Sequence, residues 1–305
     1  MIIDKPSGRT SHDVVRDVKK SLGAKKVGHA GTLDPLATGV LAVCVNEATK
    51  LTRFLLHEDK EYCATLLLGV RTDTLDREGE VIDRCEPHLQ EKEIRETVEG
   101  FVGRIEQRAP KYSAVKFKGK PLYKWTRQGV DIEPPLRDVT IHHISVTEIQ
   151  MPYVTFDVSC SKGTYIRSLC ADIGDRLGCG GCLFDLRRMR SGYFRQEDAI
   201  SLEGLADGKR LEAIEKNIIP LAEMLPGLTE IVVDQDTADR IRRGYQPDCG
   251  TLRDKNTPLL ERGDLIKFTT QGGRIAAVAT MVLSSEEISL LDEGERAVKI
   301  LRVLN

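Results

Sequence analysis

Apolar residues recur with helical spacing in three parts of the first two thirds of the chain. This spacing predicts amphipathic helices over residues 10–22, 89–101 and 164–177, each with one buried face. Gly178 directly follows the third segment, where a glycine commonly ends a helix in a left-handed conformation. A short fourth helix is expected after Pro121, because proline suits the start of a helix.

Short apolar or alternating runs between these helices, bounded by turn-forming residues, predict strands. They cover residues 39–45, 60–70, 80–84, 137–150 and 153–161. Helices and strands do not follow a regular strand–helix–strand period. A large mixed, mostly antiparallel sheet in an α+β fold therefore fits better than a doubly wound parallel sheet.

The pattern changes near residues 220–227. From there onward, short apolar runs alternate with glycine and aspartate turns, which predicts a small β-rich unit with the strand spacing of a barrel. A chain of 305 residues suits two domains, on a scale of roughly 100–200 residues each. We expect one domain over residues 1–226 and a second over residues 227–305.

The composition excludes several classes of protein. The chain is 40% hydrophobic and 30% charged, so disordered, collagen-like and coiled-coil proteins are excluded. No apolar run approaches the ~20 residues that a membrane-spanning helix needs, and the first residues lack the apolar core of a signal peptide. These features predict a cytoplasmic protein without a membrane partner. Monomer is the default expectation, since no heptad repeat is present.

The eight cysteines are scattered, several of them in apolar runs, which is typical of reduced and buried thiols. Cys179-Gly-Gly-Cys182 is an isolated pair without a second pair of ligands at a suitable spacing, so neither a structural zinc site nor any other metal site is expected. The acidic residues within 73–80 do not match a calcium-binding loop, and a polar hairpin explains them better.

The net charge is only −2, but residues 107–130 contain no aspartate or glutamate. This window holds seven cations and four aromatic residues: Arg108, Lys111, Lys116, Lys118, Lys120, Lys124 and Arg127, with Tyr112, Phe117, Tyr123 and Trp125 between them. Cations neutralise phosphates and aromatic faces stack on unpaired bases, so the window suits RNA. A solvated, lysine-rich loop and helix whose aromatics face the core explains it equally well.

The densest loop of the chain runs from Gly28 to Gly39 and contains three glycines and a proline in twelve residues. It lacks the Gly-Lys-Ser/Thr ending of a phosphate-binding Walker loop, so a nucleotide cofactor is not expected. Asp34 precedes Pro35 in this loop, which favours an extended backbone and presents its carboxylate from a stiff segment. An ionised aspartate can act as nucleophile or base, although an aspartate that only caps a turn is the simpler alternative.

Arginines at two further places in the sequence are candidate functional residues. Arg167 lies in the first turn of a predicted helix, where the helix dipole disfavours a cation unless a carboxylate pairs with it. Arg187 and Arg188 begin a basic cluster in a stretch with the character of a strand.

Six motifs fall in the order in which they occur in one enzyme family. They are Asp4-Lys-Pro-Ser-Gly-Arg-Thr-Ser-His-Asp-Val-Val15, Lys26-Val-Gly-His-Ala-Gly-Thr-Leu-Asp-Pro-Leu-Ala-Thr-Gly39, Lys60-Glu-Tyr62, Gly69-Val-Arg-Thr-Asp-Thr74, Ser113-Ala-Val-Lys116 and Ser161-Lys-Gly-Thr-Tyr-Ile-Arg167. Together they resemble the TruB family of tRNA pseudouridine synthases. The tail resembles a PUA domain, a small RNA-binding β-barrel.

The resemblance implies a pseudouridine synthase fold and isomerisation of uridine 55, in the T arm of tRNA, to pseudouridine. It implies Asp34 as the catalytic aspartate, Tyr62 as the tyrosine against the target base and Arg167 as the arginine paired with the aspartate. The implied substrate-binding residues are His29, Tyr165 and Leu186. An isomerisation conserves its atoms, so we expect no cofactor and no metal.

The basic residues are expected to hold RNA phosphates: Lys116, Lys118, Lys120, Arg187 and Arg188. Residues 186–192 and the tail look closer to the dyskerin-like branch, which works with a guide RNA in a ribonucleoprotein. Residues 72–80 and 113–129 resemble the stand-alone bacterial type, which we favour. A guide-dependent subunit and a non-catalytic RNA-binding factor stay as alternatives.

Overall fold

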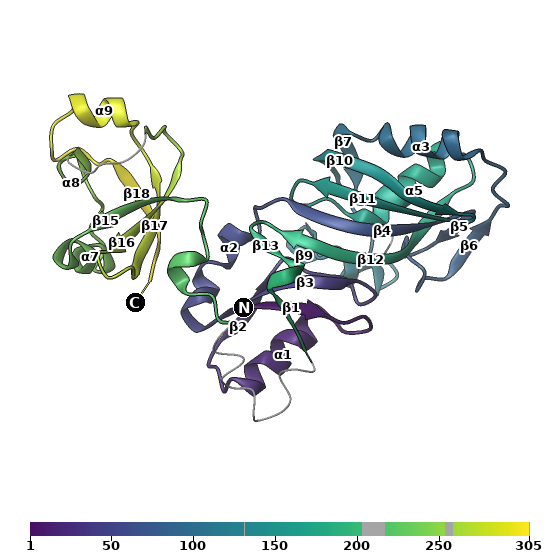
Figure 1. Ribbon diagram of the computed structural model, residues 1–305, viewed down its shortest axis with the longest axis horizontal. Helices are drawn as coiled ribbons and strands as arrows, with labels where there is room; N and C mark the ends of the chain where they lie inside the picture. The colour runs from purple at the N-terminus through teal and green to yellow at the C-terminus, as the bar shows by residue number, and fades with distance from the viewer. Residues whose placement is uncertain (131, 203–216, 254–258, 305) are drawn as a thin grey trace.

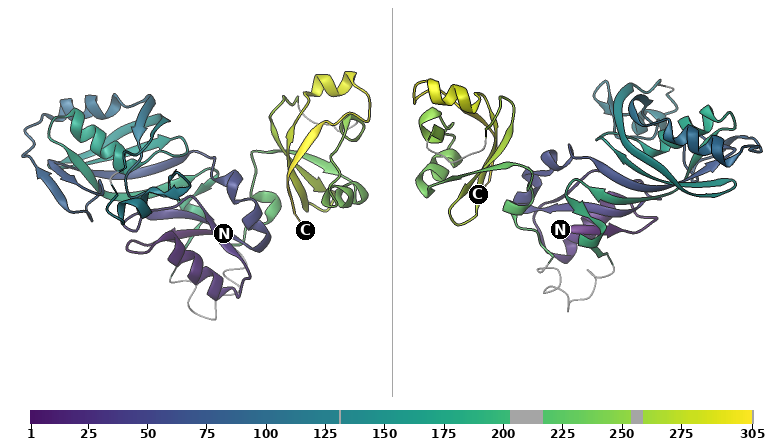
Figure 2. Two further views of the ribbon diagram at one scale, coloured as in Figure 1. Left: turned by 180° about the vertical axis from the view of Figure 1, so that it is seen from behind. Right: turned by 45° about the horizontal axis from the view of Figure 1, so that its top comes forward.

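The computed structural model describes residues 1–130, 132–202, 217–253 and 259–304. A large sheet with helices against it forms one body, and a smaller sheet toward the C-terminus forms another (Figure 1). The N-terminus lies between the two bodies, next to the place where they meet (Figures 1 and 2). This arrangement confirms the predicted fold class.

The large sheet has ten strands in the order β14-β1-β3-β12-β4-β11-β10-β7, with β13 beside β12 and β2 beside β3. The strands are β1 (Ile2–Lys5), β2 (Val27–Ala30), β3 (Thr38–Val45), β4 (Lys60–Leu68), β7 (Gly103–Arg108), β10 (Leu136–Gln150), β11 (Tyr153–Cys160), β12 (Gly181–Ser191), β13 (Phe194–Arg195) and β14 (Ala199–Ser201). Within the described ranges the pairs run antiparallel, apart from β1 with β14 and β3 with β12. The sheet is therefore mixed and mostly antiparallel, as predicted.

The three predicted amphipathic helices are present as α1 (Ser11–Ser21), α3 (Glu91–Glu99) and α5 (Ile166–Arg176). Thr10 caps α1: its side chain accepts from the backbone N–H of Asp13, and the Asp13 side chain accepts from the backbone N–H of Thr10. The shorter elements of this body are η1 (Asn46–Lys50), α2 (Thr52–Leu55), β5 (Val70–Thr72), β6 (Val81–Arg84), β8 (Lys116–Phe117), β9 (Lys120–Pro121), α4 (Leu122–Thr126), η2 (Gln196–Asp198) and η5 (Leu221–Glu223).

Alternating side chains on the central strands build the main core. In β11, Val154, Phe156 and Val158 are buried, whereas Tyr153 and Asp157 on the opposite face are exposed. The buried face packs against α3 and α5, and the same core includes residues of α1 and of the segment that leads into β3. The loop that carries Asp34 is thus continuous with the main core.

The second sheet has four strands in the order β15-β16-β17-β18. Its elements are β15 (Thr229–Val233), α7 (Gln235–Arg242), α8 (Cys249–Arg253), β16 (Leu265–Thr270), β17 (Ile275–Met281), α9 (Ser285–Leu290) and β18 (Val298–Val303). The pairing path is open, so the described residues form a curved sheet with helices instead of the closed barrel that the spacing suggested. The start of β15 fits the boundary that we propose between residues 226 and 227.

A shared apolar cluster joins the two bodies. Ile2, Phe54 and Phe194 of the first body lie in one buried cluster with Ile275 and Val278 of the second. This contact means that the second sheet is packed against the first body and is not merely tethered to it. All eight cysteines are free and six of them are buried, as the sequence predicted. No helix within the described ranges is long and apolar enough to cross a membrane.

Candidate active site

The loop that carries Asp34 connects β2 to β3 and is held by the N-terminal segment. The Ser11 hydroxyl donates to the carbonyl oxygen of Leu33 at 3.0 Å and accepts from the Leu33 N–H at 2.8 Å. The buried ammonium of Lys5 donates to the carbonyl oxygen of Pro35 at 3.2 Å. The residues on both sides of Asp34 are therefore fixed, and its carboxylate has a defined direction.

Arg167 reaches this carboxylate from the first turn of α5. Its Nε lies 2.9 Å from Oδ2 of Asp34, and its Nη2 donates to Oδ1 at 3.3 Å. The Arg167 side chain is only 5% exposed, whereas that of Asp34 is 32% exposed. The structure thus brings together the two residues that the sequence placed 133 positions apart, in a paired geometry that leaves the carboxylate accessible.

A second carboxylate, from Asp76, supports Arg167. Its Oδ2 lies 3.4 Å from Nη1 of Arg167, and its Oδ1 accepts from the Thr74 hydroxyl at 2.7 Å. Nη1 and Nη2 of Arg167 also donate to the carbonyl oxygens of Thr74 at 3.1 Å and Tyr112 at 3.0 Å. Sequence analysis assigned Asp76 only to a polar hairpin. The single signal in its favour was that it lies two residues beyond the Gly69–Thr74 motif.

The electrostatic surroundings of Asp34 act in opposite directions. Burial raises the pKa of Asp34, the Arg167 guanidinium opposes this rise, and the carboxylate of Asp76 adds to it. Such a balance is typical of a carboxylate that must stay ionised inside a partly closed site.

Tyr62 and Leu186 lie on the neighbouring strands β4 and β12. Tyr62 pairs with Arg188 in the strand register, and Leu186 pairs with Ala64. Leu186 is 5% exposed and belongs to the main core, against which Tyr62 packs. Burial raises the pKa of Tyr62, so its phenol is protonated at neutral pH.

His29 lies on β2, just before the loop of Asp34. Burial lowers the pKa of His29, and the positive charge of Arg188 lowers it further, so the ring is neutral at neutral pH. Its Nδ1 is buried and has no hydrogen-bond partner within the described ranges. A buried ring nitrogen without a partner is uncommon and is suited to receiving a polar group of a ligand.

Tyr165 lies at the N-cap of α5 and is held by Gln107. The Gln107 side chain donates to the carbonyl oxygen of Tyr165 at 3.0 Å and accepts from its N–H at 2.7 Å. Gln107 is 2% exposed and lies on β7. Sequence analysis did not single it out, because a lone glutamine 58 residues away gives no signal of this contact.

The lysines of the acid-free window lie around a small hairpin, β8–β9, and the helix α4 that follows it. Lys116 and Lys118 are exposed. Lys120 is half-buried; its ammonium lies 4.3 Å from the centre of the Trp125 ring and donates to Gln128. The window borders the site, because Arg167 donates to the Tyr112 carbonyl. Lys116 and Lys118 are thus available at the surface, whereas Lys120 packs against another residue of the window.

Arg187 and Arg188 have different surroundings, although they are adjacent. Arg187 is partly exposed and donates to both carboxylate oxygens of Asp4, at 3.1 and 2.9 Å. Arg188 is 1% exposed and donates to backbone carbonyl oxygens. Its guanidinium therefore does not reach the surface where we expected it to hold a phosphate.

Comparison with known proteins shows to which family this chain belongs. A family model described as TruB family pseudouridylate synthase (N terminal domain) matches residues 19–166, and one described as tRNA pseudouridylate synthase B C-terminal domain matches residues 167–231. The tRNA pseudouridine synthase B of Syntrophus aciditrophicus (strain SB) is 53% identical over 305 residues, which cover 100% of this chain and 98% of that relative. This chain belongs to the TruB family. It is therefore a pseudouridine synthase, an isomerase.

Other TruB relatives and solved structures extend the match. The tRNA pseudouridine synthase B of Syntrophotalea carbinolica (strain DSM 2380 / NBRC 103641 / GraBd1) is 40% identical, covering 100% of this chain and 97% of that protein. A chain in a crystal structure of a Cbf5–Nop10–Gar1 complex superposes with a TM-score of 0.79 at 32% identity, covering 99% of this chain and 84% of its own. A chain of an H/ACA ribonucleoprotein bound to a substrate RNA containing 2′-deoxyuridine gives a TM-score of 0.78 at 29% identity, covering 100% and 84%.

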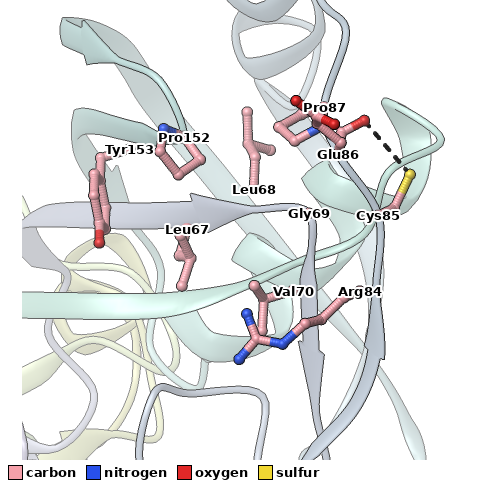
Figure 3. Close-up of a pocket in the computed structure, with 10 residues that line it drawn as sticks. All are labelled: Leu67, Leu68, Gly69, Val70, Arg84, Cys85, Glu86, Pro87, Pro152 and Tyr153. Atoms are coloured by element: carbon pink, nitrogen blue, oxygen red, sulfur yellow. Dashed lines mark hydrogen bonds between the residues drawn. The ribbon is translucent and has the colours of Figure 1, made fainter.

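Two surface cavities of this TruB protein differ in their relation to the site. One of about 620 Å³ includes Glu61 and Tyr62 of β4 and Arg190 of β12, but it is also lined by Asp157 and Ser159, which alternate with the core residues of β11 and so lie on the face of the sheet away from the main core. The other, of about 440 Å³, lies where β4 ends and contains none of the predicted site residues (Figure 3). It is lined by Leu67, Leu68, Gly69, Val70, Arg84, Cys85, Glu86, Pro87, Pro152 and Tyr153. Within the described ranges, no three acidic, histidine or cysteine side chains are grouped so that they could hold a metal ion.

Proposed function

We propose that this protein isomerises uridine 55, in the T arm of tRNA, to pseudouridine, with Asp34 as the nucleophile on a uridine turned out of the RNA. The relatives named tRNA pseudouridine synthase B support tRNA as the substrate. The observation that carries the chemistry is the Asp34–Arg167 pair, whose atoms lie 2.9 Å apart. We also propose that the enzyme acts as a monomer in the cytoplasm.

The reaction conserves every heavy atom of the nucleotide. The bond between ribose C1′ and uracil N1 breaks, the base rotates, and C1′ bonds to C5; C5 loses its proton and N1 gains one. Asp34 adds either to C1′ or to C6 of the base, and both routes require the ionised carboxylate. Arg167 keeps this carboxylate ionised beside RNA phosphates, because a cation favours the charged form of its partner.

The neighbouring side chains are suited to holding the extruded base. Tyr62 offers an aromatic face, and stacking on it offsets a cost of a few kcal/mol for removing the base from its stack. Leu186 supplies an apolar wall beside it. His29, with its unpartnered ring nitrogen, would bind the turned-out nucleotide, and Tyr165 would line the site on the side of α5.

Contacts to phosphates would supply most of the affinity for RNA. Lys116 and Lys118 are exposed near the site and are proposed to bind the T-arm backbone. Lys120 would contribute by holding the hairpin on Trp125, and Arg187 by orienting the strand beside Asp4. Residues 227–305 are proposed to act as a PUA-like RNA-binding domain.

A guide-dependent subunit is the second candidate function. It is favoured by the superposition on the Cbf5 chain of the Cbf5–Nop10–Gar1 complex. The stand-alone activity is favoured by relatives that match the whole chain at higher identity. The two candidates differ in one measurable respect, since only the stand-alone enzyme acts on RNA without a guide or partner proteins.

Tritium release from RNA that carries [5-³H]uridine tests the proposal, because C5 loses its hydrogen when pseudouridine forms. The purified chain is expected to release tritium from a tRNA transcript and from an isolated T-arm stem-loop, but not from a transcript with cytidine at position 55. Asp34→Asn should lower the single-turnover rate by at least about 10³-fold and leave the Kd for RNA within a few fold.

Asp83→Asn is the matched control, because Asp83 lies on the exposed strand β6. This variant should keep the rate of the unmodified enzyme. Release only after addition of a guide RNA would establish the second candidate instead. If the protein binds RNA but releases no tritium under any condition, it is a non-catalytic RNA-binding factor. Full activity in Asp34→Asn would show that Asp34 has no part in the mechanism.

A further inference from the structure

Arg188 lies at the base of the loop that carries Asp34. Its Nε donates to the carbonyl oxygen of Val40 at 2.7 Å, and its Nη2 donates to the carbonyl oxygen of Gly31 at 3.1 Å. Gly31 and Val40 stand at opposite ends of the loop. One guanidinium therefore joins the two ends of the segment from which the Asp34 carboxylate projects.

A glycine allows this close approach. Gly39 has a φ of +98°, and a Cβ on it would lie 2.2 Å from the carbonyl oxygen of Arg188. The two residues are partners where β3 and β12 pair in parallel. The main chain of Arg188 thus lies directly against Gly39, at the C-terminal end of the loop. From there its side chain can reach the carbonyl oxygens of Gly31 and Val40.

The same guanidinium faces the other side of the proposed site. Tyr62 is the partner of Arg188 where β4 pairs with β12, and the positive charge of Arg188 lies close enough to Tyr62 and to His29 to lower the pKa of both side chains. Among the described residues, the Arg188 guanidinium donates to backbone carbonyl oxygens and forms no ion pair with a carboxylate. Burial of a cation without an anionic partner is costly, so a role in the site would account for its place here.

We propose that Arg188 is a positioning residue, which fixes the Asp34 loop and the Tyr62 side chain relative to each other and does not contact RNA. The proposal rests on the proposed function, because it concerns the reaction assigned to Asp34. A fixed loop matters because a displacement of about 1 Å in a reacting group can cost about 10²-fold in rate. Arg188 would thereby act on the chemical step and not on the affinity for RNA.

Two variants test this role by separating rate from binding. Arg188→Lys keeps the charge but replaces the planar guanidinium by one ammonium, which cannot reproduce the separate Nε and Nη2 bonds to the two ends of the loop. Arg188→Met removes the charge and all the hydrogen bonds. At saturating T-arm RNA, the single-turnover rate of tritium release should fall about 10-fold in the lysine variant and about 100-fold in the methionine variant. The Kd for RNA should stay within about threefold of the unmodified protein.

Arg104→Lys and Arg104→Met are the matched controls. Arg104 lies on the edge strand β7, and its exposed guanidinium pairs with Asp138 at 2.7 Å. Both control variants should keep the full rate. All variants are assayed at a temperature where their far-UV circular dichroism equals that of the unmodified protein, and the lysine variant carries the test if the methionine variant does not fold.

The outcomes separate the proposal from its competitors. A higher Kd and a smaller salt dependence, with an unchanged rate at saturation, would make Arg188 a phosphate contact and overturn the proposal. An unchanged rate and Kd in Arg188→Lys would overturn it as well, by showing that the two-ended contact is dispensable. Failure of the unmodified protein to release tritium would instead overturn the proposed function.

Discussion

Gln107 hydrogen-bonds both backbone groups of Tyr165, the residue that immediately precedes α5. The first turn of that helix carries Arg167, so the position of the guanidinium relative to Asp34 depends on where the helix begins. A buried amide from the edge strand β7 therefore helps to set the geometry of the Asp34–Arg167 pair, without contacting either member.

Replacement of this amide should affect both stability and rate. Gln107→Leu leaves the N–H and the carbonyl oxygen of Tyr165 without their partner, which should lower the free energy of unfolding by about 2–3 kcal/mol. The shift of α5 should also lower the single-turnover rate about 10-fold. Urea denaturation and tritium release measure the two effects. Gln150→Leu, at the exposed end of β10, is the control and should change neither.

Asp76 should be needed for a fully active Arg167. Asp76→Asn removes one of the two carboxylates beside the buried guanidinium, which is then held less firmly against Asp34. We expect the single-turnover rate to fall by about 10–100-fold, with little change in the Kd for RNA. Asp83→Asn, on the exposed strand β6, serves as the control. A rate equal to that of the unmodified protein would show that Asp76 is not needed to orient Arg167.

The rate should depend on pH through Asp34. Only the ionised carboxylate reacts, and burial raises its pKa above the ordinary 3.8, so the rate should fall as pH falls through this raised value. Arg167 opposes the rise. Arg167→Gln should therefore move the acid limb to higher pH in addition to lowering the maximal rate. Single-turnover rates measured from about pH 5 to about pH 8 give the acid limb of the unmodified protein and that of Arg167→Gln. An acid limb at the same pH in both proteins would contradict the assignment to Asp34.

Asp172, in the middle of α5, should limit stability at neutral pH. Burial raises its pKa to about 6, and the neighbouring Asp175 adds to the effect. The native protein therefore keeps a proton that the unfolded chain, with a pKa of about 3.9, has lost. The free energy of unfolding consequently falls as pH rises between these two values, and above them the loss is complete.

Asp172→Asn should remove this penalty. Its free energy of unfolding should exceed that of the unmodified protein by about 1 kcal/mol near pH 7.5, a value reduced for the partial exposure of the side chain. The difference should be small near pH 4 and vanish below it, where Asp172 is protonated in both the native and the unfolded protein. Urea denaturation at the two pH values measures it. If the free energies of unfolding of the two proteins differ by the same amount at both pH values, the titration of Asp172 is not the cause of the difference.

Lys116 and Lys118 should contribute to affinity through phosphate contacts. Each substitution by alanine should weaken T-arm binding at low salt and reduce the slope of log Kd against log salt concentration by about 1. Lys120→Ala should act differently, by loosening the packing on Trp125. Lys92→Ala, on the exposed side of α3, is the control for a general loss of charge. If this slope is unchanged in Lys116→Ala and Lys118→Ala, residues 107–130 are a solvated surface that does not bind phosphates.

The sequence predicted most local structure because short-range rules dominate there. Helix α1 begins at the residue after Thr10, because the Thr10 side chain and Asp13 form a cap within four consecutive residues. Strand β11 alternates over its whole length, so its buried side was readable. The second domain was correctly predicted to be β-rich, but the spacing of its turns could not show whether its strands form a closed barrel or an open sheet.

The site was only partly predictable, because its contacts join distant parts of the chain. Asp34 and Arg167 were found through motifs and through the need of a cation for a carboxylate. Gln107 and Asp76 act on residues 58 and 91 positions away; nothing in the local sequence marks Gln107, and Asp76 is marked only by its position just beyond the Gly69–Thr74 motif. Arg188 was expected to bind phosphate because it belongs to a cluster of arginines, but it lies two residues after Leu186 and therefore shares the buried face of β12.

The position of β12 has a consequence for the synthesis of the protein. Arg188 follows Val40 by 148 residues, so the two ends of the loop between Gly31 and Val40 cannot be joined while the first part of the chain leaves the ribosome. Arg167 also arrives late. A nascent chain thus carries Asp34 for about half of translation without Arg167 and Arg188, and the geometry of the proposed site can form only after the central strand β12 has been made.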